Sequence, residues 1–436
     1  MVNVSIVTAG SRGDVQPYVA LGHGLQQAGY KVRILANENF ESLVTESGLD
    51  FDSIGENIEA ITQTEEWRKT IESGNFLKIL AKMQSEMKRH AAKSARIIPN
   101  LLKGSDLLIT GMGGIGGIYD LAETMHIPTV QAYVFPFTPT SEFPAPLVPN
   151  LPLGVVLNRL SFHVLRQMFW QNVKPSDTAI RQAVGMGKGS FWGPYASLQR
   201  RHVPAIYGFS PHVLPQPHDW PDNHLVTGYW YLDAPDGWTP PTDLVDFLNR
   251  GKPPVYIGFG SMLSTNPEEA GKVAIGALER SGQRGIIASG WGGLKTSQLP
   301  DTVYAVSSIP HSWLFPRMAA VVHHGGAGTT SAGLGAGIPS IIIPFMGDQP
   351  YWGKRVADLG VGTKPIPHKK LTLEKLTAAI NEAISDTSMR QRAADLGQAI
   401  RAENGVGKAV SLIRQFGQSL GVAQPSTATT ISISGD

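Results

Sequence analysis

The sequence lacks cysteine and any large net charge. None of its 436 residues is cysteine, which excludes disulfide bonds, thiolate metal sites and cysteine catalysis together. Lysine, arginine, aspartate and glutamate make up only 17% of the chain, and the formal net charge is +2. Because no basic stripe is visible along the sequence, we expect no nucleic-acid partner.

Long apolar runs are also missing. No apolar stretch reaches the roughly 18 residues that a membrane-spanning helix needs. The start, Met1 to Thr8, alternates like a strand and has no basic leader before an apolar core, so it does not resemble a signal peptide. These patterns predict a cytoplasmic protein and leave open a peripheral contact with membranes.

The first half of the chain alternates between strand and helix patterns. "VNVSIVTAG" predicts a strand that stops at Gly10, and the apolar spacing of "DVQPYVALGHGLQQAGY" predicts a helix that ends at Gly29. Strands follow at "KVRILAN", "DLLITG" and "PTVQAYVF", with helices near 75–103 and 116–125. This rhythm is typical of a parallel, doubly wound sheet, and we assign residues 1–232 to one Rossmann-like domain.

A turn-rich stretch at 215–254 is interpreted as the interdomain connection, with 233–253 as the linker itself. The rhythm restarts at Pro254 with strands "VYIGFG", "RGIIASG", "VYAVSS", "AAVVHH" and "SIIIPF", which define a second domain at 254–420. Its last helix could pack back on the first domain, and the polar tail 421–436 is expected to be disordered. The predicted fold class is α/β, with two Rossmann-like doubly wound sheets facing each other across a cleft where ligands bind.

Glycines, histidines and hydroxyls crowd the segment "VVHHGGAGTT" at residues 321–330. The pattern predicts a strand, a glycine loop and the start of a helix, so that backbone N–H groups and the helix dipole could hold an anion. The lysine-containing loop of nucleoside triphosphatases is absent from the sequence. A diphosphate bound without a metal fits this loop, and a glycine-rich turn around a buried histidine is the alternative.

Two more loops place polar residues after predicted strands. Asp348 and Gln349 follow "SIIIPF", and a carboxylate beside a carboxamide can bind the vicinal hydroxyls of a sugar. In "TAGSRGDVQPYVALG", Asp14 stands at the mouth of a helix, where it is either an N-cap or a general base that faces the cleft. Helix capping is the alternative for both loops.

The segments "GSRGDVQPYVALGHGL", "VYIGFGSM", "IPHSWLFP", "HHGGAGTT" and "PFMGDQPYW" resemble the nucleotide-sugar-dependent glycosyltransferases with two Rossmann-like domains, the GT-B fold. Within that family they look most like the sterol 3-β-glucosyltransferase branch, with bacterial antibiotic glycosyltransferases as near relatives. The resemblance runs from Val4 to about Val410, with the motifs in the family's order.

The resemblance implies a role for each loop. Asp14 stands at the position of the catalytic base, with Pro17 at the family's spacing. His324, rather than His323, is implied as the diphosphate contact by counting back from Pro339. The other implied donor contacts are Ser11, Arg12, Gly13, Ser261, Gly326, Gly328, Thr329 and Thr330 for the diphosphate, Ile309 for the nucleobase, and Asp348 and Gln349 for the sugar.

One position departs from the family. Plant members stack uracil on a tryptophan just before the position of Ile309, and here Ser308 stands there. Trp291 in "SGWGG" is the candidate for the stacking face, with a buried structural tryptophan as the alternative.

Two further patterns have competing interpretations. "GMGGIG" at 111–116 follows a strand, but no acidic residue ends the next strand, so close packing or a wall of the acceptor pocket is favoured over a dinucleotide site. "VVLNRLSFHVLRQMFW" is amphipathic, with Leu157, Leu160, Val164 and Met168 along one face. It predicts a helix packed on the sheet, an apolar acceptor channel or a surface that rests on lipid.

The leading hypothesis is an inverting glycosyltransferase. It would move a hexose, glucose from UDP-glucose, to a hydroxyl of an apolar acceptor such as a sterol or another polycyclic or aromatic natural product. Neither a metal nor another cofactor is expected. The alternatives are a nucleotide-sugar epimerase and a non-catalytic protein that binds a nucleotide sugar or a lipid.

Overall fold

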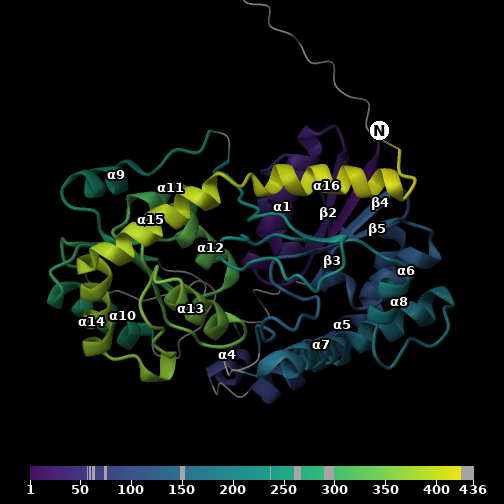
Figure 1. Cartoon of the computed structure of the whole chain (residues 1–436), viewed down its shortest axis with the longest axis horizontal. Coiled ribbons are helices and arrows are strands. Elements are labelled where there is room, and N and C mark those ends of the chain that lie inside the picture. The colour runs from purple at the N-terminus through teal and green to yellow at the C-terminus, as the bar shows by residue number, and fades with distance from the viewer. Residues whose placement is uncertain are drawn as a thin grey trace, which may run out of the picture.

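Two parallel β-sheets, each covered by helices, lie side by side in the computed structural model (Figure 1). The structure describes residues 1–55, 57, 60, 64–72, 76–147, 153–235, 237–259, 267–288 and 299–423. Ser261, Trp291 and the predicted tail from residue 424 onward lie outside the described residues.

The N-terminal sheet has seven strands in the order β3-β2-β1-β4-β5-β6-β7. Their bounds are β1 Asn3–Val7, β2 Lys31–Asn37, β3 Asp50–Gly55, β4 Leu107–Thr110, β5 Thr129–Tyr133, β6 Ala205–Tyr207 and β7 His224–Val226. Neighbouring strands all pair in parallel. The sequence patterns missed β3, β6 and β7. Because β7 lies within 215–254, interpreting that whole stretch as an interdomain connection was wrong.

The C-terminal sheet has five strands in the order β10-β9-β8-β11-β12, also parallel. Their bounds are β8 Val255–Gly258, β9 Gly285–Ala288, β10 Val303–Val306, β11 Ala320–His323 and β12 Ser340–Ile342. All five segments were predicted as strands. The short apolar runs of β8 and β11 are buried along their whole length, as expected for parallel strands covered on both faces.

Helices connect the strands and cover both sheets (Figure 1). In the first half these are α1 Arg12–Gln27, α2 Glu41–Thr45, α4 Glu65–Glu72, α5 Phe76–Leu101, α6 Ile118–Thr124, α7 Gly154–Val184 and α8 Tyr195–Arg200. In the second half they are α9 Thr242–Asn249, α10 Pro267–Arg280, α11 His311–Leu314, α12 Ala327–Ala336, α13 Gln349–Asp358, α14 Leu373–Ser385, α15 Thr387–Arg401 and α16 Gly405–Ser419. None of the helices in the described ranges is both long and apolar enough to cross a membrane.

The glycines of "GMGGIG" serve close packing after β4. A Cβ on Gly111 would lie 2.0 Å from the carbonyl oxygen of Ala132, and one on Gly114 would lie 2.5 Å from Cγ2 of Thr110. No larger side chain fits either position without moving the neighbouring strand. This close approach explains the glycines without a dinucleotide.

The last helix returns to the N-terminal half. In Figure 1, α16 lies along α1, and its residues Ala409 and Ile413 are buried in the same core as β1 and β2. Gly24 of α1 permits the contact, because a Cβ there would lie 2.4 Å from Cγ1 of Val406. The chain therefore crosses between the two sheets a second time.

The strand orders locate where a ligand can bind. The order reverses direction between β1 and β4 in the first sheet and between β8 and β11 in the second. Open α/β sheets bind ligands beyond the carboxyl ends of the strands at such points. The loops after β1 and β11 follow the strands at these two points. His324 lies in the loop after β11, and Asp14 lies in the first turn of α1, just after the loop that follows β1.

Candidate active site

The loop after β1 fixes the carboxylate of Asp14 by local bonds. Gly10 has a φ of 133°, and Ser11 is the N-cap of α1. One carboxylate oxygen of Asp14, Oδ2, accepts hydrogen bonds from the backbone N–H of Ser11 at 2.7 Å and from its hydroxyl at 2.8 Å. A Cβ at position 10 would lie 2.5 Å from the same oxygen, so glycine there leaves room for the carboxylate.

The interpretation of Asp14 as the N-cap itself was wrong, because Ser11 is the N-cap and Asp14 is the third residue of α1. The carboxylate caps the helix through Ser11, yet its environment also changes its acidity. Burial raises the pKa of Asp14, and the two hydrogen bonds from Ser11 act in the opposite direction. A partly buried carboxylate with a raised pKa, held by one oxygen, can still accept a proton on the other.

The loop after β11 is built around the two histidines. His323, the last residue of β11, is fully buried, and its Nδ1 accepts a hydrogen bond from the backbone N–H of Gly325 at 3.1 Å. His324 is partly exposed, and its ring lies over the loop, where a Cβ on Gly326 would be 2.5 Å from its Nε2. His323 therefore has a structural role, and His324 is the less buried of the two.

Several polar atoms of this loop are buried without a partner. Nδ1 of His324 and the hydroxyl oxygen of Thr330 form no hydrogen bond with any described residue. Burial lowers the pKa of His324 to about 4, so its imidazole is neutral near pH 7 and can donate one hydrogen bond. Unpartnered buried polar groups are costly, and a bound anion at the start of α12 would satisfy them.

The two loops face each other across the gap between the sheets. A Cβ on Gly328, in the first turn of α12, would lie 3.6 Å from Cα of Gly13, in the first turn of α1. Burial lowers the pKa of His311 to about 4, and the nearby positive charge of Arg12 acts in the same direction. Two helix N-termini and an arginine thus converge on one place, which creates a positive potential suited to a diphosphate.

The loop before α13 supplies a second carboxylate. Oδ2 of Asp348 accepts a hydrogen bond from the indole N–H of Trp352 at 2.8 Å. Burial raises the pKa of Asp348 to about 6, and the negative charge of Asp14 acts in the same direction. The two carboxylates therefore lie close enough to interact, although they come from different sheets.

Gln349 is tied to its own loop. Its side-chain oxygen accepts hydrogen bonds from the backbone N–H groups of Phe345 at 2.8 Å and Met346 at 3.1 Å. This shapes the turn that presents Asp348. The turn also meets the N-terminal half, because a Cβ on Gly347 would lie 3.9 Å from Cδ2 of Leu147.

The remaining predicted contacts are distributed around these loops. Ile309 lies between β10 and α11 and is partly buried, and Thr329 is in the first turn of α12. Arg12 is exposed and donates from Nε to Gln16 at 2.9 Å. Ser261 and Trp291 fall on residues that the structure does not describe.

Sequence patterns assigned no role to two residues that the structure places at the site. His311 stacks on Phe315 with ring centroids 4.2 Å apart, and burial, together with the nearby Arg12 and His324, lowers its pKa. Trp352 holds Asp348 through its indole N–H. Both stand inside quoted motifs, "IPHSWLFP" and "PFMGDQPYW", but only the folded chain shows what they contact. Among the described residues, no cluster of three or more histidines, aspartates or glutamates could hold a metal.

Two parallel α/β domains, with a carboxylate loop on one and a glycine-rich anion loop on the other, define the GT-B class of glycosyltransferases. Residues 4–104 match the glycosyltransferase family 28 N-terminal domain, and residues 286–407 match the C-terminal domain of the erythromycin biosynthesis protein CIII-like family. Both matches agree with the resemblance to glycosyltransferases that the motifs predicted.

Curated relatives point to one branch of the family. The chain is 36% identical to "Sterol 3-beta-glucosyltransferase UGT80A2" of Arabidopsis thaliana, over 94% of this chain and 64% of that protein. It is 35% identical to the sterol 3-beta-glucosyltransferase of Cryptococcus neoformans over 98% of this chain and 28% of that protein. The chain thus spans less than two thirds of the plant relative and less than a third of the fungal one.

Solved structures confirm the GT-B fold. The glycosyltransferase of kitacinnamycin superposes with a TM-score of 0.65 at 17% identity, covering 95% of this chain and 98% of that one. VinC, solved in complex with dTDP, gives a TM-score of 0.65 at 18% identity, covering 95% of this chain and all 100% of that one.

Proposed function

We propose that the chain transfers a hexose, glucose from UDP-glucose, to a hydroxyl group of an apolar acceptor such as a sterol. The observation that carries the proposal is the approach of the Asp14 loop to the glycine loop, with Gly13 and Gly328 at the point of contact. A base on one side and an anion site on the other are the two parts that a glycosyl transfer needs. The names of the plant and fungal relatives favour a sterol among apolar acceptors.

The reaction follows from the arrangement of these groups. The acceptor oxygen attacks the anomeric carbon of the sugar while the bond to the diphosphate oxygen breaks, and the electron pair of that bond leaves with the nucleoside diphosphate. Asp14 takes the proton of the acceptor hydroxyl as the new bond forms, because a carboxylate is too weak a base to remove it beforehand. A single displacement inverts the anomeric configuration.

The leaving diphosphate would be stabilised by groups that are already in place. His324, the backbone N–H groups at the start of α12 and Thr330 would donate hydrogen bonds, and the N-terminus of α1 with Arg12 would add positive potential. Asp348 would accept hydrogen bonds from the sugar hydroxyls, with Gln349 shaping its loop. These groups supply the charge stabilisation that a metal provides in other transferases.

The same proposal divides the work between the domains. Residues 1–232 would bind the acceptor and residues 254–420 the donor, with Ile309 beside the nucleobase and Ser261 and Trp291 as further donor contacts. A cytoplasmic location belongs to the proposal as well.

Calorimetric titration with UDP, UDP-glucose and TDP-glucose in the presence of EDTA tests the donor site. We expect saturable binding of the uridine nucleotides without a metal, and absence of binding to all three would overturn the proposal. Sterols and flavonoids are then supplied with UDP-glucose, and the product is analysed for a β-linked glucoside. Conversion of UDP-glucose to another sugar nucleotide without acceptor would favour the epimerase, and donor binding without any turnover would favour a binding protein.

A further inference from the structure

A patch of exposed apolar side chains covers the outer face of α7 and the turn that follows it. The α7 patch consists of Val155, Val156, Leu157, Leu160, Val164, Phe191 and Trp192. Val156 is 77% exposed, and Trp192 is 67% exposed. The opposite face of α7 is buried, with Phe162, Leu165 and Trp170 in the core. The helix therefore has two apolar faces, and only one of them is covered by the fold.

The aromatic part of the patch is held in place by specific contacts. Phe191 and Trp192 pack edge to face with ring centroids 5.1 Å apart. The backbone oxygen of Phe191 accepts hydrogen bonds from the side-chain amides of Gln167 at 3.2 Å and Gln171 at 3.4 Å, which join the turn to α7. The ammonium group of Lys174 lies 5.3 Å from the Phe191 ring. The two rings are thus fixed in an exposed position.

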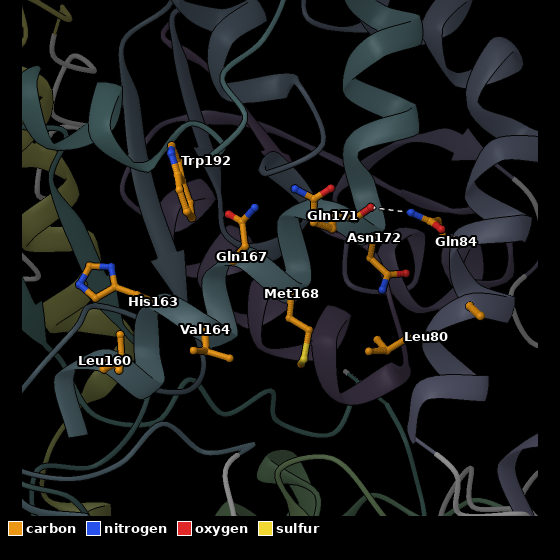
Figure 2. A pocket seen from close by; sticks show the side chains of 11 residues that line it. Leu80, Gln84, Leu160, His163, Val164, Gln167, Met168, Gln171, Asn172 and Trp192 are labelled. Carbon is orange, nitrogen blue, oxygen red and sulfur yellow. Dashed lines mark hydrogen bonds between the residues drawn. The ribbon is translucent and has the colours of Figure 1, made fainter. Parts of the chain in front are cut away.

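A groove continues the patch between α7 and α5 (Figure 2). It has a volume of about 530 Å³, and Leu80, Leu160, Val164, Met168 and Trp192 are among the residues that line it. The side-chain amide of Gln84 donates to the backbone oxygen of Gln171 at 2.9 Å and joins the two helices. None of the predicted donor-site residues lines the groove. Contiguous apolar surface of this kind marks a site of interaction with another molecule or with lipid.

The charges around the patch are mostly positive. Seven lysines and arginines but only one carboxylate, Glu86, lie between residues 76 and 103, and residues 153–192 carry five such cations and only Asp177. Both carboxylates are in ion pairs, Glu86 with Arg89 at 3.0 Å and Asp177 with Arg181 at 2.8 Å. Two carboxylates from other helices also pair with cations of these segments, Glu66 of α4 with Lys82 and Asp120 of α6 with Arg181. The net charge of the whole chain is only +2, so positive charge is concentrated on the two helices that flank the groove.

We propose that the α7 patch and the cations of α5 and α7 form a docking surface for a bilayer that contains anionic lipid. Valine, leucine, phenylalanine and tryptophan enter the interfacial region, and the exposed cations Lys88, Arg159 and Lys188 contact phosphate head groups. Protein interfaces are depleted in lysine relative to the rest of the surface, whereas helices that lie in the membrane interface combine apolar residues with lysine and arginine. This inference goes beyond the proposed transfer reaction and does not depend on it.

Flotation with vesicles tests the proposal on the whole chain. The probes are phosphatidylcholine vesicles with and without phosphatidylglycerol, at low and at high salt. We expect the chain to float with the anionic vesicles at low salt and to be released by salt, because screening weakens contacts with exposed charges. The double variant Val156→Ser/Trp192→Ser should lower the vesicle partition coefficient by at least about ten-fold.

Two further variants separate charge from apolar insertion. Arg159→Glu/Lys188→Glu should weaken binding by about five-fold or more for each cation removed, and only toward anionic vesicles. Leu420→Ser, at an exposed leucine outside the patch, and Lys272→Glu, on α10, are the matched controls and should float like the wild type. Thermal unfolding of every variant checks that the fold is retained.

Three results would overturn the docking surface. The first is a wild-type chain that does not float with anionic vesicles at low salt, and the second is patch variants that float as well as the wild type. The third is a wild-type dimer that the patch substitutions convert to a monomer without any vesicle binding, which would assign the patch to a second copy. Vesicle binding needs no donor, so its failure leaves the transfer reaction standing, and failure of UDP binding leaves this surface standing.

Discussion

Substitution of Asp14 by asparagine removes the proposed base and keeps almost everything else. An asparagine oxygen can accept the same two hydrogen bonds that Oδ2 accepts from the backbone and hydroxyl of Ser11. The N-terminus of α1 therefore stays capped, and the gap at Gly10 stays filled by a side chain of the same shape. The proposed donor contacts at His324, Thr330 and Asp348 keep their side chains.

The expected loss follows from the contribution of a general base. A positioned base typically contributes about 10²–10⁴-fold to a rate, which corresponds to about 3–5 kcal/mol of activation free energy. We expect Asp14→Asn to lose this factor in kcat with a glucosyl acceptor, while the dissociation constant of UDP-glucose changes less than about three-fold. Calorimetry gives the affinity, and product formation under saturating donor gives kcat. A variant that turns over at the wild-type rate would show that Asp14 is only a helix cap.

The pH dependence of kcat/KM distinguishes a catalytic base from a residue that only caps the helix. In the proposed mechanism, transfer requires ionised Asp14, so kcat/KM is expected to fall as the pH drops below the pKa of this group. Hydrogen bonds from Ser11 lower that pKa against the effect of burial, and Ser11→Ala removes the one from the hydroxyl. The acid limb should therefore move to higher pH. Ser47→Ala, which removes a hydroxyl bonded to the Leu43 carbonyl away from the site, should leave the limb in place.

Three other predictions concern the donor side. His324→Ala should weaken UDP-glucose binding by about 10–100-fold through the lost hydrogen bond to a charged group, with thermal unfolding nearly unchanged, and an unaltered affinity would remove His324 from the site. Gly326→Ala should have a similar effect, because its Cβ would meet Nε2 of His324 at 2.5 Å, whereas Gly187→Ala, at an open position, should bind normally. Burial raises the pKa of Asp348 from 3.8 to about 6, so the free energy of unfolding of the wild type decreases as the pH rises through this window. Asp348→Asn has no charge to bury, so it should be about 2–3 kcal/mol more stable than the wild type at pH 8 but not at pH 3.5. Urea unfolding at both pH values measures the difference, and equal stability at pH 8 would contradict the burial of that charge.

Many individual helices, strands and loops of this protein were predictable because residues close together in the sequence determine them. The spacing of apolar residues gave the helix of α1, and the apolar runs gave β8 to β12, since buried parallel strands need few other signals. Strands of three residues such as β6 and β7 are too short to show a recognisable alternation of apolar and polar residues. They are defined by their pairing in the sheet, β6 with β5 and β7 with β6. The loops at Asp14 and His324 were found because glycine and a helix start have a distinct sequence pattern.

The sequence by itself determined the two βα rhythms, the glycine loop, the position of Asp14 at a helix start and the family to which these motifs belong. Only the tertiary structure decided what meets across the chain: Gly13 with Gly328, the charge of Asp14 with that of Asp348, and the apolar side chains of α5 with those of α7. A near-neutral net charge concealed the basic helices, because a sum over the sequence does not show where charges gather. The physical reason is that side-chain spacing along the chain fixes local conformation, whereas the distances between loops and helices far apart in sequence are fixed by packing of the sheets and helices between them.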